Sequence, residues 1–151
     1  MSFRKVAVLF FVTACSSATR GGNGAQLTGA AEPKLAAEQF LRAVKANDLQ
    51  AISTVWGTQN GPARETMERT SMEKREIILV CYLTHDTSRV IGEASGSQGR
   101  RDIRVELKRG NLTRQTTLYT IRGPGARWYV ENVDIAAVRD FCGNPGTSAG
   151  R

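Results

Sequence analysis

The spacing of apolar residues changes near residue 86 of this 151-residue chain, and the change limits the folds open to it. In segment 33–46, apolar residues recur at intervals of three and four, which places them on one face of an α-helix. In segment 102–108, apolar and charged residues alternate, as in a strand with one buried face. Helices followed by a run of strands predict a single α+β domain.

Two helices are expected at the start of the folded part, which we place near Glu32. Pro33 suits the first turn of an amphipathic helix, and Asn47 and Asp48 end that helix. Asp48 also supplies an N-cap for a second, shorter helix, which Gly57 ends.

A third helix is expected after a turn region at 58–63. Helical composition resumes at Arg64, and Thr70 with Glu73 has the pattern of a capping box. The apolar run 77–83 is compatible with a buried strand or a helix. We assign it to the helix, because the residues before it favour helix and contain no breaker.

Four strands are expected in the second half, separated by turns rich in glycine. They form an antiparallel meander with one face exposed to water. The predicted strands cover residues 88–95, 102–108, 112–122 and 127–135.

The first 15 residues have the organisation of a secretion signal. Arg4 and Lys5 precede an apolar stretch at 6–12, which is too short for a membrane span of roughly 20 residues. Segment 12–15 reads Val-Thr-Ala-Cys and resembles the lipobox of bacterial lipoproteins. The competing interpretation, a buried strand that ends in Ala-Cys, does not explain this order of charge, apolar run and cysteine. We therefore expect residues 1–14 to be a signal peptide and Cys15 to be lipidated.

Lipidation at Cys15 would hold the mature chain at a membrane through two or three acyl chains, enough for stable anchoring. Ser16 stands where an aspartate would imply retention at the inner membrane, so the resemblance implies the outer membrane, facing the periplasm. Residues 15–31 are expected to form a flexible tether, residues 32–142 the domain and residues 143–151 a disordered tail.

Cys81 and Cys142 remain as a pair once Cys15 carries lipid. In an oxidising compartment they predict a disulfide that closes a loop of roughly 60 residues and stabilises the fold by about 4 kcal/mol. Two buried free thiols or a reactive site are the alternatives. The spacing excludes a CxxC redox pair.

Two segments carry a resemblance to a known fold: the helix pair at 36–48, and the final hairpin at 117–121 with 127–130, in which a tryptophan precedes an aliphatic residue by two. Over about residues 33–140 they resemble the nuclear transport factor 2-like, cystatin-like cone fold, and most closely small bacterial lipoproteins of that fold with no assigned function. The resemblance implies a curved sheet around the long helix and an apolar pocket in the cone. Segment 58–76 is longer than in many relatives.

Trp128 is the expected contact between helix and sheet. The resemblance turns it inward, against Phe40 and Val44. A register shift by one residue would turn Tyr129 inward instead, and would also move every side chain placed by the same alternation.

The resemblance suggests candidates for acid–base chemistry, because ketosteroid isomerase and scytalone dehydratase use Asp, Tyr or His in the cone pocket. The candidates in this chain are Tyr82, His85, Asp86, Tyr119 and Asp134. Catalysis needs an acid and a base that converge on a dry cavity. The spacing does not show convergence, and we interpret His85 and Asp86 as the end of a helix and the start of a turn.

Other classes of site have little support in the sequence. One histidine and two distant cysteines do not supply the four ligands that zinc prefers, so neither a metal nor a cofactor is expected. The net charge of +7 would suit nucleic acid, but an envelope location does not. A cluster of basic residues along the strands is interpreted as a solvated face, although it could meet an acidic partner: Arg100, Arg101, Arg104, Lys108, Arg109 and Arg114.

We therefore expect an envelope-anchored, non-catalytic binding module. Its partners would be the membrane, through Cys15, and a small apolar ligand or an envelope protein, held in the pocket or on the basic sheet face. Two alternatives stay open: an acid–base enzyme of the same fold, and an inhibitor or immunity-type lipoprotein that blocks a toxin or hydrolase. A cavity lined by two convergent titratable groups would favour the enzyme.

Overall fold

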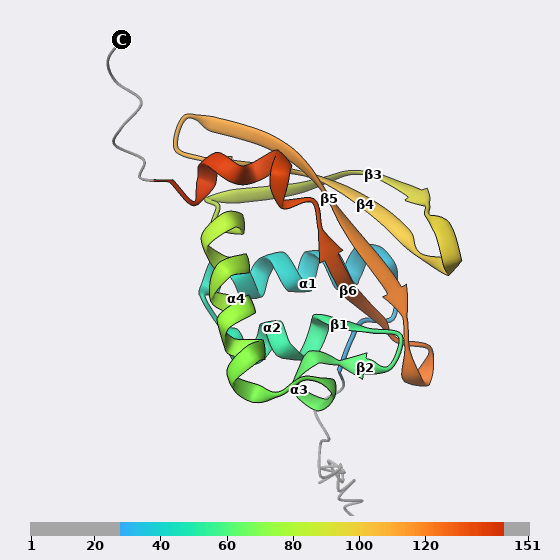
Figure 1. The fold of residues 1–151 in the computed structure, drawn as a ribbon. Helices are drawn as coiled ribbons and strands as arrows, with labels where there is room; N and C mark the ends of the chain where they lie inside the picture. The colour runs from blue at the N-terminus through green and yellow to red at the C-terminus, as the bar shows by residue number, and fades with distance from the viewer. Residues whose placement is uncertain (1–27, 144–151) are drawn as a thin grey trace, which may run out of the picture.

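The computed structural model describes residues 28–143, which form helices followed by an antiparallel sheet (Figure 1). The predicted signal peptide, Cys15 and most of the predicted tether lie outside these residues, as does the tail after Gly143. The helices are α1 (Pro33–Ala46), α2 (Leu49–Val55), α3 (Ala63–Thr66) and α4 (Arg69–Leu83). The strands of the main sheet are β3 (Thr87–Ser95), β4 (Arg101–Arg109), β5 (Leu112–Arg122) and β6 (Trp128–Val133).

The main sheet is a meander with the strand order β3-β4-β5-β6, so β3 and β6 are its edges. Every neighbouring pair is antiparallel. The sheet curves over α1, while α4 stands at one end of the domain (Figure 1). The predicted α+β class is thus confirmed, with a cone-like arrangement.

Helix α1 forms where the sequence predicts it. Pro33 occupies its first turn, and Asn47 ends it in the left-handed conformation with φ of 54°. Its apolar stripe is buried against the sheet. The interior strand positions are filled in the same way, so the inside of the cone is packed with the chain's own side chains: Phe40, Leu41, Val44, Ile103, Val105, Leu107 and Leu118.

The turn region at 58–63 is more ordered than predicted. The short strands β1 (Gly57–Thr58) and β2 (Gly61–Pro62) pair there, and α3 follows directly. Three short 3-10 helices complete the chain: η1 (Ser97–Gly99), η2 (Pro124–Ala126) and η3 (Ile135–Phe141).

Helix α4 contains the apolar run, as predicted, but the predicted capping box is wrong. Glu68 is the N-cap in place of the Thr70 capping box, because its carboxylate accepts the N–H groups of Thr70 and Ser71 at 2.7 Å. Part of the apolar run also faces water, since Ile77 and Ile78 are 59% and 51% exposed. One face of a helix cannot hold consecutive residues, so only part of this run reaches the core.

The folded part begins earlier than predicted, by Thr28 rather than Glu32. The Gly29 N–H donates to the Thr54 carbonyl at 2.7 Å, and Ala30 exchanges two 2.8 Å backbone hydrogen bonds with Trp128. Gly29 has φ of +66°, and a Cβ there would lie 2.8 Å from the Tyr129 ring. The Tyr129 ring therefore comes so close to the backbone that only glycine fits at position 29. This glycine lies in the segment predicted to be a flexible tether.

Trp128 and Tyr129 occupy opposite faces of β6. Trp128 packs against the core cluster that contains Phe40 and Val44, as predicted, but it stays partly exposed. Tyr129 is 2% exposed and lies outside that cluster, where its hydroxyl hydrogen-bonds to the Thr28 hydroxyl at 3.2 Å. The segment that precedes α1 thus covers the outer face at Tyr129.

The final strand is shorter than predicted, since β6 ends at Val133 and η3 follows it. Val138 and Phe141 of η3 are buried in the core cluster. Next to them the structure joins Cys142 to Cys81 of α4 by a disulfide, with the two Cα atoms 4.9 Å apart. The end of the domain is thus tied to α4.

Candidate functional site

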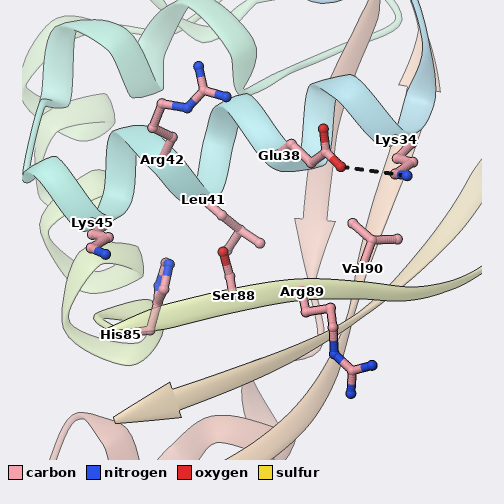
Figure 2. Close-up of a pocket in the computed structure, with 9 residues that line it drawn as sticks. All are labelled: Lys34, Glu38, Leu41, Arg42, Lys45, His85, Ser88, Arg89 and Val90. Atoms are coloured by element: carbon pink, nitrogen blue, oxygen red, sulfur yellow. Dashed lines mark ion pairs between the residues drawn. The ribbon is translucent and has the colours of Figure 1, made fainter.

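A groove of about 480 Å³ lies between α1 and the edge strand β3 (Figure 2). Leu41 and Val90 supply its apolar surface, while charged side chains surround them. The full lining is Lys34, Glu38, Leu41, Arg42, Lys45, His85, Ser88, Arg89 and Val90.

The two elements present these residues by their regular geometry. On α1, the lining positions run from residue 34 through 38, 41 and 42 to 45, which is one continuous helix face. On β3, Ser88 and Val90 are two residues apart and point to the same side of the sheet. Arg89, between them, points away from α1 (Figure 2).

The groove carries an excess of positive charge. Lys34 lies 3.8 Å from Glu38, and Arg89 is 3.0 Å from Glu106 of β4. Lys45 donates to the backbone carbonyl of Asp86, a neutral acceptor, at 2.5 Å. Within residues 28–143, neither Lys45 nor Arg42 has an acidic side chain at ion-pair distance. These two cations of α1 therefore remain available to an acidic ligand.

His85 lies at one end of the groove, with its ring turned towards Lys45 (Figure 2). It is 4% exposed, and its Nδ1 is 2.7 Å from the Leu83 carbonyl, so Nδ1 carries the proton and donates. Burial lowers the pKa of His85 and the Lys45 ammonium lowers it further, although the Leu83 hydrogen bond opposes both. This environment therefore favours the neutral imidazole.

The other acid–base candidates do not join His85 in the groove. The Asp86 carboxylate accepts the Gly110 N–H at 2.7 Å and organises a turn. Tyr119 alternates with buried Leu118 and so lies on the opposite face of the sheet from the core. Tyr82 packs against the core cluster from α4.

Asp134, the fifth candidate, serves the end of β6. Its backbone N–H donates to the Thr117 carbonyl at 2.9 Å, and its carbonyl accepts from the Thr116 hydroxyl at 2.7 Å. Of the five candidates, only His85 lines the groove. The convergence that acid–base catalysis requires is therefore not formed by this set.

Glu76 is a titratable residue that the sequence analysis missed. It is 1% exposed on α4, and neither carboxylate oxygen has a hydrogen-bond partner within the described residues. Burial raises its pKa to about 7, and repulsion from Glu73 adds to this. The helical repeat contains the signal, since Glu76 follows buried Met72 by four residues and precedes Leu79 by three.

Half of the six basic residues predicted along the strands are paired with acids: Arg100, Arg101 and Arg114. Arg101 pairs with Glu93 at 2.9 Å, and Arg109 donates to the Phe141 carbonyl. Arg100, just before β4, pairs with Glu131 of β6, and Arg114 of β5 pairs with Asp140 of η3. These contacts reduce the free charge along the strands, although Arg104 and Lys108 form no ion pair within residues 28–143.

Residues 28–143 contain no cluster of three or more His, Cys, Asp or Glu side chains able to hold a metal ion. No helix in that range is long and apolar enough to cross a membrane. Comparisons with protein-family models, with curated proteins and with solved structures found no match for this chain. The site is therefore interpreted from its own geometry.

Proposed function

We propose that this chain is an envelope-anchored, non-catalytic binding module with a nuclear transport factor 2-like domain. In this proposal its α1–β3 groove holds an acidic group of an envelope partner, and lipid on Cys15 attaches the protein to the outer membrane. The observation that carries the proposal is the groove itself, where Arg42 and Lys45 lie beside an apolar floor and have no acidic side chain at ion-pair distance within residues 28–143. The lipid anchor rests on the Val-Thr-Ala-Cys segment and the apolar run before it.

The packed interior of the domain argues for an acidic partner over a small apolar ligand. An apolar ligand needs an apolar cavity that buries most of its surface. The interior positions of α1, β4 and β5 are occupied by side chains that are almost fully buried. In the groove, by contrast, only Leu41 and Val90 are apolar, and the cations around them favour a carboxylate or phosphate.

Fluorescence anisotropy with labelled hexaglutamate tests this function on full-length protein purified from membranes in detergent. We expect saturable binding that weakens as salt rises, because exposed charges attract less strongly when screened. Labelled hexalysine should not bind.

A pair of matched variants locates the binding site. Arg42→Glu/Lys45→Glu should weaken hexaglutamate binding by at least tenfold. Lys74→Glu/Arg75→Glu makes the same change of charge on exposed positions of α4 and should weaken binding by less than threefold. Equal losses in the two variants would show a general charge effect and would refute the groove as the site.

A further inference from the structure

The two edges of the main sheet differ in how their backbone is covered. Along β6, Ala30 bridges Trp128 and Trp56 bridges Val130, so other segments occupy that edge. Within the described part of the chain, no such bridge covers the outer side of β3. An uncovered edge strand presents unpaired N–H and C=O groups that can pair with another strand.

A bulge restricts the usable part of this edge. The pairing of β3 with β4 is regular from Thr87 to Val90, and then skips Ile91 before it resumes at Gly92. Such a bulge bends the strand and interrupts pairing along it. Within this regular stretch, residues 88–90 line the groove beside α1.

This stretch of β3 has a hollow on each face. The 480 Å³ groove lies on the inner face, towards α1. A second pocket, of about 230 Å³, lies on the outer face and is lined by Thr87, Ser88, Arg89, Glu106 and Lys108. A strand that pairs with an edge sends alternate side chains to the two faces, so each set would meet one hollow.

We infer that the partner contributes an extended acidic peptide segment, which adds to the sheet as a fifth strand along residues 87–90. This inference rests on the proposed function and names the form of its ligand. Acidic side chains at alternate positions face α1 and meet Lys45, while Arg42, whose side chain extends from α1 away from β3 (Figure 2), adds positive charge at the rim of the groove. The intervening side chains enter the outer hollow, where Lys108 adds a positive charge to the Arg89–Glu106 pair.

The dimensions of the groove agree with such a segment. The lining stripe of α1 runs from Lys34 to Lys45, which is about 16 Å at 1.5 Å per residue. An extended peptide rises about 3.3 Å per residue, so five residues span the same length. Two or three of those residues face α1, which is enough to bring acidic side chains to its positively charged face.

The test uses full-length protein and a capped octapeptide in which Glu alternates with Val or Thr. We expect saturable binding, and at least fivefold slower amide exchange for the outward-facing amides of residues 87–90. The Arg42→Glu/Lys45→Glu variant should lose both effects. A peptide with Lys in place of Glu should not bind.

Two N-methylated versions of the octapeptide separate strand addition from simple charge attraction. One carries N-methyl groups at the odd positions and the other at the even positions, so both keep every side chain. If the peptide adds to the sheet, one N-methylated version should lose at least tenfold in binding affinity and the other less than twofold, because only alternate N–H groups of the added strand face β3. Equal affinity of all three peptides would overturn strand addition while leaving the groove as an acidic-ligand site.

Two further outcomes would also overturn the inference. Binding of hexaglutamate without binding of the octapeptide would be consistent with the proposed function but would refute the addition of a fifth strand. A dimer in which the amides at 87–90 are protected before any peptide is added would show that a second copy occupies this edge. Failure of both peptides to bind would refute the inference and the proposed function together.

Discussion

Neutralising Glu76 should stabilise this protein, and the gain should depend on pH. The side chain is buried on α4, and both of its oxygens lack hydrogen-bond partners within the described residues. A buried ionised carboxylate without a partner destabilises the folded state, so burial favours the protonated form of Glu76. Glu76→Gln keeps the size of the side chain and removes the charge.

The magnitude follows from the pKa of Glu76, which burial raises from 4.5 to about 7. Between these two values the folded state binds more protons than the unfolded state, so the free energy of unfolding falls as pH rises. Below pH 4.5 the carboxyl is neutral in both states and carries no such penalty. Above pH 7 the penalty is complete, at about 3 kcal/mol.

Urea unfolding followed by tryptophan fluorescence measures this effect at pH 5 and pH 8. Glu76→Gln should gain about 3 kcal/mol over wild type at pH 8 and less than about 1 kcal/mol at pH 5. Glu76→Met should gain more than Glu76→Gln at both pH values, because it also removes a buried polar group without a partner. Glu65→Gln, on an exposed residue of α3, serves as the control and should differ little from wild type.

A gain for Glu76→Gln that is the same at pH 5 and pH 8 would refute this reasoning. It would mean that the pKa of Glu76 is the same in the folded and unfolded states. A loss of stability for Glu76→Gln at pH 8 would also refute the reasoning, since it would show that the ionised carboxylate stabilises the folded protein.

Three further predictions concern the anchor, the core and the disulfide. Cys15→Ser should accumulate as an uncleaved precursor, and metabolic labelling with a fatty-acid analogue should fall to background; undiminished labelling would end the lipoprotein proposal. Tyr129→Ala should cost about 3–5 kcal/mol in urea unfolding and Trp128→Ala less, because Trp128 is partly exposed; a larger loss for Trp128 would contradict their placement on β6. Reduction of wild type should lower the free energy of unfolding by about 4 kcal/mol and leave a Cys81→Ser/Cys142→Ser variant unchanged; equal responses would argue against the disulfide.

The sequence by itself determined the elements whose residues repeat with a clear period. Four such patterns are local: the apolar stripe of α1, the end of α1 at Asn47, the cap of α2 at Asp48 and the alternation along β4. Each pattern follows from the backbone geometry of a short segment and does not depend on the rest of the chain. These patterns were sufficient for the α+β class and for the order of the strands.

Only the tertiary structure decided which residues form the site. His85 and Lys45 meet because β3 folds back beside α1, and no local pattern encodes that approach. Contacts distant in sequence also gave Gly29 a structural role, since its partner Thr54 lies on another element. Burial depends on what packs against a helix face as well as on the face itself. Glu76 illustrates this, since it is 1% exposed although the charged residues just before it, Lys74 and Arg75, are exposed.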